Sequence, residues 1–176
     1  MINRQVLIFP LKYIPQDKIE SFSEEEQILY LRSRDIDEDF ETILLGCAQY
    51  KLYKQEFSNI GLTYGIFRKI RIISLLETFD IFHLFQNCKQ RIPKGGTYLE
   101  IGSNTGGSLI CTHEATKNKD IKYIAIDPFL CESFVESAFF QNTSHISNLK
   151  FFKNKSSEVV DQIPDKSIDL LLIDGD

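Results

Sequence analysis

From Thr97 to the end of the 176-residue chain, short apolar segments alternate with segments that suit helices. The expected strands cover residues 97–101, 123–126, 149–152 and 168–173, and the expected helices between them cover residues 108–117, 131–140 and 157–163. Strands that alternate with helices are joined by right-handed crossovers, which produce a parallel sheet with helices on both faces. The sequence therefore predicts an α/β fold with a doubly wound, mostly parallel sheet, of which these residues supply four strands.

The first half of the chain has a different pattern, which predicts a mainly helical N-terminal cap over residues 1–92. Residues 43–57 suit one helix. Residues 64–91 are apolar on nearly every side, so they are expected to be buried as one helix or as two pieces. The acidic stretch within residues 17–41 is expected to be a solvated surface rather than a docking site. A proline and paired glycines end this region, and residues 93–176 form the second expected unit.

The charge balance argues against two classes of partner. The 20 basic and 25 acidic side chains give a net charge of −5, so neither nucleic acid nor an anionic membrane surface is expected. No segment is long and apolar enough to suggest a signal peptide or a membrane span. The 4 cysteines and 3 histidines are scattered, which gives little support for a zinc site or a disulfide framework. These observations predict a soluble, cytoplasmic protein.

One turn carries the strongest chemical signal, because an acidic strand end is followed by a glycine-rich loop and then by a helix. The segment runs from Glu100 through Gly102-Ser103-Asn104-Thr105-Gly106-Gly107 to Ser108. Glycines permit a positive φ and a close backbone approach, and a helix N-terminus offers unpaired N–H groups, so the turn predicts a nucleotide-sized ligand site. The dinucleotide fingerprint G-x-G-x-x-G is not met, since Asn104 takes the place of its second glycine. Glu100 would repel a pyrophosphate and suits a ligand that carries a positive charge.

These residues resemble motif I of the class I S-adenosylmethionine-dependent methyltransferases, a family with a Rossmann-like sheet. There the loop wraps the methionine part of the cofactor, which implies cofactor contacts from Glu100, Gly102, Ser103, Asn104, Gly106, Gly107 and Ser108. Asp127 ends the second expected strand, where the family's acidic residue binds both ribose hydroxyls. A carboxylate accepts two hydrogen bonds at once, which suits a vicinal diol.

The resemblance continues to the C-terminus, because residues 95–176 are similar to the family 24 methyltransferases, which include macrocin-type O-methyltransferases. It implies S-adenosylmethionine as the cofactor and O-methylation of a small-molecule or sugar-containing acceptor. Lys155 stands where many members carry an acidic residue near the adenine, so Ser156 is the better candidate for that contact. The family's sheet starts with the strand order 3-2-1-4 and continues beyond it, so this chain is expected to be truncated after the fourth strand.

Asp174 ends the fourth expected strand and is the expected catalytic residue, as well as a contact to the cofactor. In metal-dependent relatives, carboxylates at this place hold a divalent ion that lowers the pKa of the acceptor hydroxyl. Asp174 and Asp176 are therefore candidate ligands for an ion such as Mg²⁺. The alternative is that Asp174 only lines the cofactor pocket and that Asp176 has no role.

Two other functions stay open beside methyl transfer. One is a non-catalytic methyltransferase remnant, and the other is a nicotinamide-dependent oxidoreductase with the same type of sheet. Asn104 and Glu100 count against the oxidoreductase. The apolar fourth strand would have an unpaired edge, which favours a homodimer. The expected partners are thus a small-molecule acceptor and a second copy of the chain.

Outside the motif, the histidines and basic residues are expected to have structural roles. His83 falls in the apolar segment and is expected to be a satisfied core histidine, whereas His145 is expected at the surface. Three basic residues, Arg68, Lys69 and Arg71, are expected on a solvated face.

Overall fold

The computed structural model describes residues 46–74, 76–130 and 133–175. The chain divides into two compact units, residues 1–54 and residues 55–176, and each is described by itself. In the first unit the described residues are helical from 46 to 52. The expected acidic surface within residues 17–41 lies outside the described residues. The second unit contains the whole sheet and the helices that precede it, so the structural boundary comes well before residue 93. The role of residues 1–92 as a cap stays a prediction.

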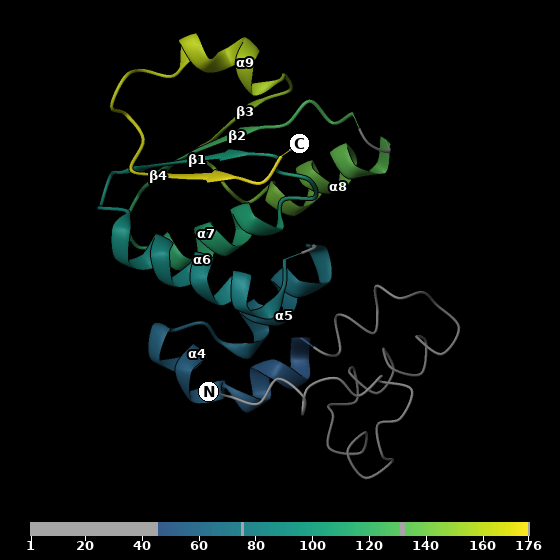
Figure 1. The fold of residues 1–176 in the computed structure, drawn as a ribbon, viewed down its shortest axis with the longest axis vertical. Coiled ribbons are helices and arrows are strands. Elements are labelled where there is room, and N and C mark those ends of the chain that lie inside the picture. Colours follow the sequence, from purple (N-terminus) through teal and green to yellow (C-terminus); the bar gives the residue numbers. More distant parts are fainter. Residues whose placement is uncertain (1–45, 75, 131–132, 176) are drawn as a thin grey trace. The chain divides into compact units, whose positions relative to one another are not determined.

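Four parallel strands form the sheet of the second unit: β1 (Thr97–Ile101), β2 (Lys122–Ile126), β3 (Leu149–Phe152) and β4 (Leu170–Ile173). Their order is β3-β2-β1-β4, so the chain first moves outward from β1 and then returns to its other side (Figure 1). The predicted α/β fold with a doubly wound parallel sheet is confirmed. This order brings the ends of β1, β2 and β4 together at one edge, where a ligand site is expected in such sheets.

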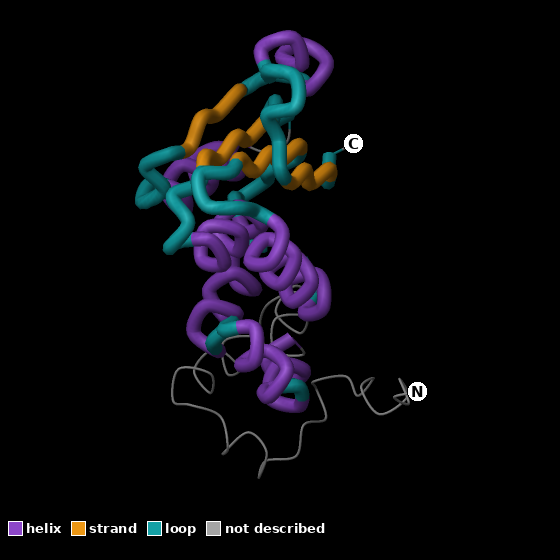
Figure 2. The backbone as a smooth tube through the Cα atoms, turned by 90° about the vertical axis from the view of Figure 1, so that its left-hand side faces the viewer, coloured by secondary structure: helices purple, strands orange, loops and turns teal. Residues whose placement is uncertain are grey.

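Helices cover both faces of the sheet (Figures 1 and 2). One face carries α7 (Gly107–Thr116) and α8 (Ser133–Thr143), with α5 (Tyr64–Ile73) and α6 (Thr78–Arg91) packed against α7. The other face carries the short α9 (Ser156–Val159) and the 3-10 turn Val160–Gln162. Before α5 lies α4 (Lys54–Ile60), whose Phe57 contacts Phe82 of α6 edge-to-face.

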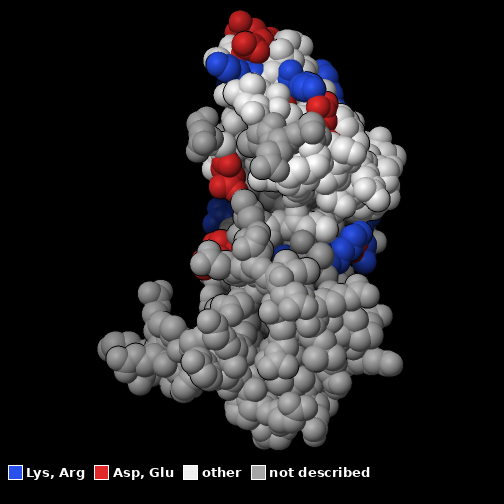
Figure 3. All heavy atoms as spheres, turned by 90° about the vertical axis from the view of Figure 1, so that its right-hand side faces the viewer, with Lys and Arg blue, Asp and Glu red and all other residues white. Residues whose placement is uncertain are grey.

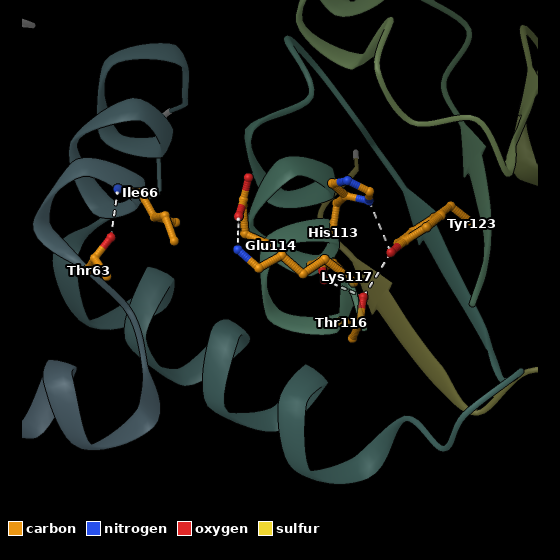
Figure 4. A network of polar contacts seen from close by, with 8 residues as sticks. Thr63, Ile66, His113, Glu114, Thr116, Lys117 and Tyr123 are labelled. Atoms are coloured by element: carbon orange, nitrogen blue, oxygen red, sulfur yellow. Dashed lines mark hydrogen bonds and ion pairs between the residues drawn. The ribbon is translucent and has the colours of Figure 1, made fainter. Parts of the chain in front are cut away.

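The expected apolar helix of residues 64–91 is two helices. The Thr63 hydroxyl caps α5 by accepting the N–H of Ile66 (Figure 4). At the other end Ser74 is extended, and its hydroxyl donates to the carbonyl of Ile70. Arg71, predicted on a solvated face, is buried instead, because its guanidinium donates to the carbonyl of Leu76 at 2.8 Å. The buried guanidinium thus binds the backbone of the linker between α5 and α6.

The core lies on both sides of β1. On one side α7 is buried almost along its whole length, between the sheet and α6. On the other side Leu99, Ile126 and Val159 form a small cluster beneath α9. Helix α7 is also tied to β2 by polar contacts, since the Tyr123 hydroxyl lies 2.8 Å from Oγ1 of Thr116 and 3.2 Å from Nδ1 of His113 (Figure 4). These contacts fix the helix that follows the glycine loop.

Charge is unevenly spread over the surface. The face in Figure 3 has charged side chains at its upper tip, whereas a broad uncharged area lies below them. Three large apolar side chains near β2 and α8 are exposed, namely Leu130, Phe134 and Phe140. Among the helices that the structure describes, none combines the length and the apolar character needed to cross a membrane.

Candidate functional site

The glycine loop forms a tight turn between β1 and α7. Gly102 has a φ of +85°, and its N–H donates to the carbonyl of Ile126 in β2 at 2.9 Å. Asn104 also has a positive φ, +44°, which asparagine tolerates better than most residues. Gly106 has a φ of +88° and is the N-cap of α7, and its N–H donates to the carbonyl of Ser103. The turn therefore directs the N-terminus of α7 toward the carboxyl ends of the strands.

Asp127, at the end of β2, holds this loop in place. Its Oδ2 accepts the backbone N–H groups of Ser103 at 2.8 Å and of Asn104 at 2.9 Å. Its Oδ1 accepts the N–H of Phe129 at 2.7 Å. The carboxylate is only half-buried, so it retains acceptor capacity on the solvent side. Asp127 thus positions the loop in addition to the ribose role that the sequence predicts.

Glu100 is a buried carboxyl group directly beneath the loop. It is 0% exposed, and its Oε2 accepts the Tyr98 hydroxyl at 2.7 Å. Its Oε1 and the Oγ of Ser103 are buried and have no hydrogen-bond partner among the described residues. Burial raises the pKa of Glu100 to about 7, while the Tyr98 hydroxyl opposes this shift. Near neutral pH the group therefore changes between a neutral acid and an anion.

The glycines of the loop are needed for packing within the protein as well as for ligand approach. A Cβ on Gly106 would lie 2.8 Å from Cγ2 of Thr143, and one on Gly107 would lie 2.1 Å from Cβ of Ser74. The loop is thus enclosed by α8 on one side and by the α5–α6 linker on the other. The Thr105 hydroxyl donates to the carbonyl of Ile73, which strengthens the second of these contacts.

A cavity of about 770 Å³ opens beside the loop, a size within the usual range for small-molecule sites. The lining comes from the loop, the α5–α6 linker, one face of α6, and β4 with the residue Asp174 that follows it. Of the predicted site residues, six line it: Gly102, Ser103, Asn104, Gly107, Ser108 and Asp174. Glu100 is buried behind the loop, and Asp127 contacts the loop from the side of β2.

Comparisons with known proteins agree with this geometry. A family model described as a methyltransferase domain matches residues 99–176, which begin in β1 and include the loop, Asp127 and Asp174. Residues 99–176 are therefore similar to a methyltransferase domain. The structure is also similar to the SAH-bound methyltransferase PaMTH1 from Podospora anserina, with a TM-score of 0.50 and 13% sequence identity. The match covers 88% of this chain and 59% of that one, so this chain spans less than two thirds of its length. No protein with curated annotation matches the sequence.

Two predicted site residues lie outside the cavity or outside the described residues. Ser156 is the first residue of α9 and is half-buried, and it is not part of the cavity lining. Its predicted adenine contact stays a prediction. Asp176 lies outside the described residues. Across the described ranges, no group of three or more His, Cys, Asp or Glu side chains could hold a metal ion.

The sequence analysis missed one wall of the cavity. His83, predicted to be a core histidine, is exposed and lines the cavity, so that prediction is wrong. Asp80, Asn87 and Arg91 of the same helix line it too. The sequence places these polar residues on one face of a helix, since they recur every three or four positions, but it does not show that a cavity borders this face.

Proposed function

We propose that this methyltransferase domain binds S-adenosylmethionine at the glycine loop and transfers its methyl group to a hydroxyl of a small-molecule acceptor. The arrangement that carries the proposal is the loop itself, fixed by Asp127 and opening into the cavity that Asp174 also lines. Glu100 is buried directly behind the loop, so the proposed site places the ammonium group of the cofactor on the cavity side of an acidic group. The SAH-bound neighbour supports the same assignment.

The cofactor supplies a methyl group that is already activated on a sulfonium, so the C–S bond breaks as the acceptor oxygen forms its C–O bond and loses a proton. The residues of the chain then have two tasks, which are to align the two reactants and to accept the proton. Asp174 and His83 both line the cavity and can accept a proton. Asp174 is the favoured catalytic residue, since it directly follows β4, at the strand-end edge where the loop lies.

The compartment, the oligomeric state and the metal are further parts of the proposal. Cys88 and Cys111 are free, buried thiols, which supports the proposal of a reducing cytoplasm. In the described sheet β4 pairs with β1 alone, and Leu171 and Ile173 of β4 are 49% and 64% exposed. A homodimer through this edge remains a proposal. The metal-dependent form of the reaction also remains a prediction.

Titration of S-adenosylhomocysteine into the protein, followed by calorimetry, tests the proposal. We expect saturable binding of S-adenosylhomocysteine to the unchanged protein and no binding of NADH. Binding of NADH without binding of S-adenosylhomocysteine would reverse the assignment in favour of an oxidoreductase. Absence of binding of either ligand to folded protein would favour the non-catalytic remnant.

Replacement of Asp127 gives a sharper form of this test. Asp127→Ala should weaken S-adenosylhomocysteine binding by about 10- to 100-fold, because the ribose contact and the loop support are lost together. Asp169→Ala is a matched control, since Asp169 also accepts a backbone N–H, that of Thr97 at 2.8 Å, but at the opposite end of the sheet. Equal affinities for the two variants would show that the ribose lies elsewhere.

A further inference from the structure

The cavity extends well beyond the glycine loop, along the whole of α6. Four polar residues of this helix line it at three- or four-residue spacing: Asp80, His83, Asn87 and Arg91. Residues with this spacing lie on one face of a helix. The linker that begins at Ser74 contacts the loop, so the start of α6 is near the loop and Arg91 is at the far end of the stripe. From His83 to Arg91 the helix rises by about 12 Å.

Arg91 is an exposed residue at the end of α6 that has a side-chain hydrogen bond and no charged partner among the described residues. The side-chain amide of Asn87 donates to the carbonyl of His83 at 2.8 Å, and Nε of Arg91 donates to Oδ1 of Asn87 at 2.9 Å. Within the described part of the chain no carboxylate pairs with Arg91, and Asp80 on the same face is about 16 Å away along the helix axis. The terminal amino groups of the guanidinium remain for a ligand, and their planar fork suits a carboxylate.

The opposite wall of the cavity is apolar. Leu170 and Leu172 of β4 line it, and in the sheet they are in register with Tyr98 and Glu100. Residues in register share one face of a sheet, so both leucines are on the face that carries α6 and α7. On the side of α6, Leu84 adds one apolar side chain to the lining. The cavity is thus amphipathic, with an apolar floor and a polar side that ends in a cation.

We propose that this part of the cavity binds the methyl acceptor, and that the acceptor is an amphipathic organic acid whose anionic group pairs with Arg91. The proposal rests on the proposed function, because the loop end of the same cavity must hold the cofactor. The apolar body of the acceptor lies on Leu170 and Leu172, while its hydroxyl reaches the loop end. Burial of the apolar body supplies affinity, and the guanidinium of Arg91 selects the acid.

A pair of fluorescent probes tests this assignment without knowledge of the natural acceptor. 8-Anilino-1-naphthalenesulfonate carries an apolar ring system and an anionic group, and N-phenyl-1-naphthylamine has the same rings without the charge. Both are titrated into the full chain with and without saturating S-adenosylhomocysteine. We compare the unchanged protein with Arg91→Gln and with Lys94→Gln, which removes the same charge just beyond α6 at a residue outside the cavity lining. Circular dichroism verifies that each variant is folded.

The anionic probe should bind saturably, and Arg91→Gln should weaken its binding about tenfold while leaving the neutral probe unchanged. Lys94→Gln should alter neither affinity. Both probes should bind together with S-adenosylhomocysteine. The proposal is overturned if the anionic probe does not bind, if Arg91→Gln leaves its affinity unchanged, or if S-adenosylhomocysteine displaces it. Probe binding that depends on Arg91 in a protein that fails to bind S-adenosylhomocysteine would instead refute the cofactor assignment and retain the anion site.

Discussion

Gly102→Ala is expected to destabilise the protein by about 3–5 kcal/mol, enough to unfold much of a domain of ordinary stability. A Cβ at this position would lie 2.5 Å from the carbonyl oxygen of Asp174 and 2.6 Å from Cα of Gly175. These are backbone atoms at the end of β4, so they can move only if the pairing of β1 with β4 is disturbed. The φ of +85° adds the strain of a left-handed conformation.

Gly95→Ala is the matched control for this substitution. Gly95 has a φ of +76°, close to that of Gly102, but a Cβ there would meet no atom within 4 Å. It should therefore cost only the backbone strain, about 1 kcal/mol. Urea unfolding monitored by circular dichroism measures both losses. Failure of Gly102→Ala to fold agrees with the expectation when Gly95→Ala folds, whereas similar losses for the two variants would show that close packing at Gly102 is unimportant.

The sheet could be predicted from the sequence because its strands are short, apolar and bounded by glycine, proline or polar residues. β1 was expected at residues 97–101 and β3 at residues 149–152, and both have these bounds. The helical half was harder, because an apolar segment gives no sign of where a helix breaks. The break at Ser74 depends on hydrogen bonds from Ser74 and Arg71 to nearby carbonyl groups, and these contacts exist only in the folded chain.

The site was predictable where it depends on local backbone and unpredictable where it depends on packing. The motif of Glu100 and Gly102 predicts a turn at a strand end, and the structure has one. It does not show that Gly102 faces the backbone of Asp174, since β4 is distant in sequence and its position follows from the strand order. The role of His83 was missed for the same reason, because a helix that is buried against α7 on one side can border a cavity on the other.

Glu100 is expected to make the stability of the protein fall as the pH rises through neutrality. Its pKa is about 7 in the folded protein and about 4.5 in an exposed carboxyl group, so between these values the folded state binds more protons than the unfolded state. The contribution of Glu100 to the free energy of unfolding is then full below pH 4.5 and is lost as the pH rises to about 7. The full effect of this one group amounts to about 3 kcal/mol.

Glu100→Gln should remove this dependence, because an amide does not titrate. The glutamine carbonyl can still accept the Tyr98 hydroxyl, and its amide can donate to the unpartnered Oγ of Ser103. We therefore expect the free energy of unfolding of the variant to increase relative to that of the unchanged protein as the pH rises from 5 to 8. Both proteins are unfolded in urea at each pH. In the difference between the two free energies of unfolding, the contributions of the other titrating groups cancel. A constant difference across this range would mean that Glu100 is already ionised in the folded protein at pH 5, and that its buried charge is compensated by groups other than Tyr98.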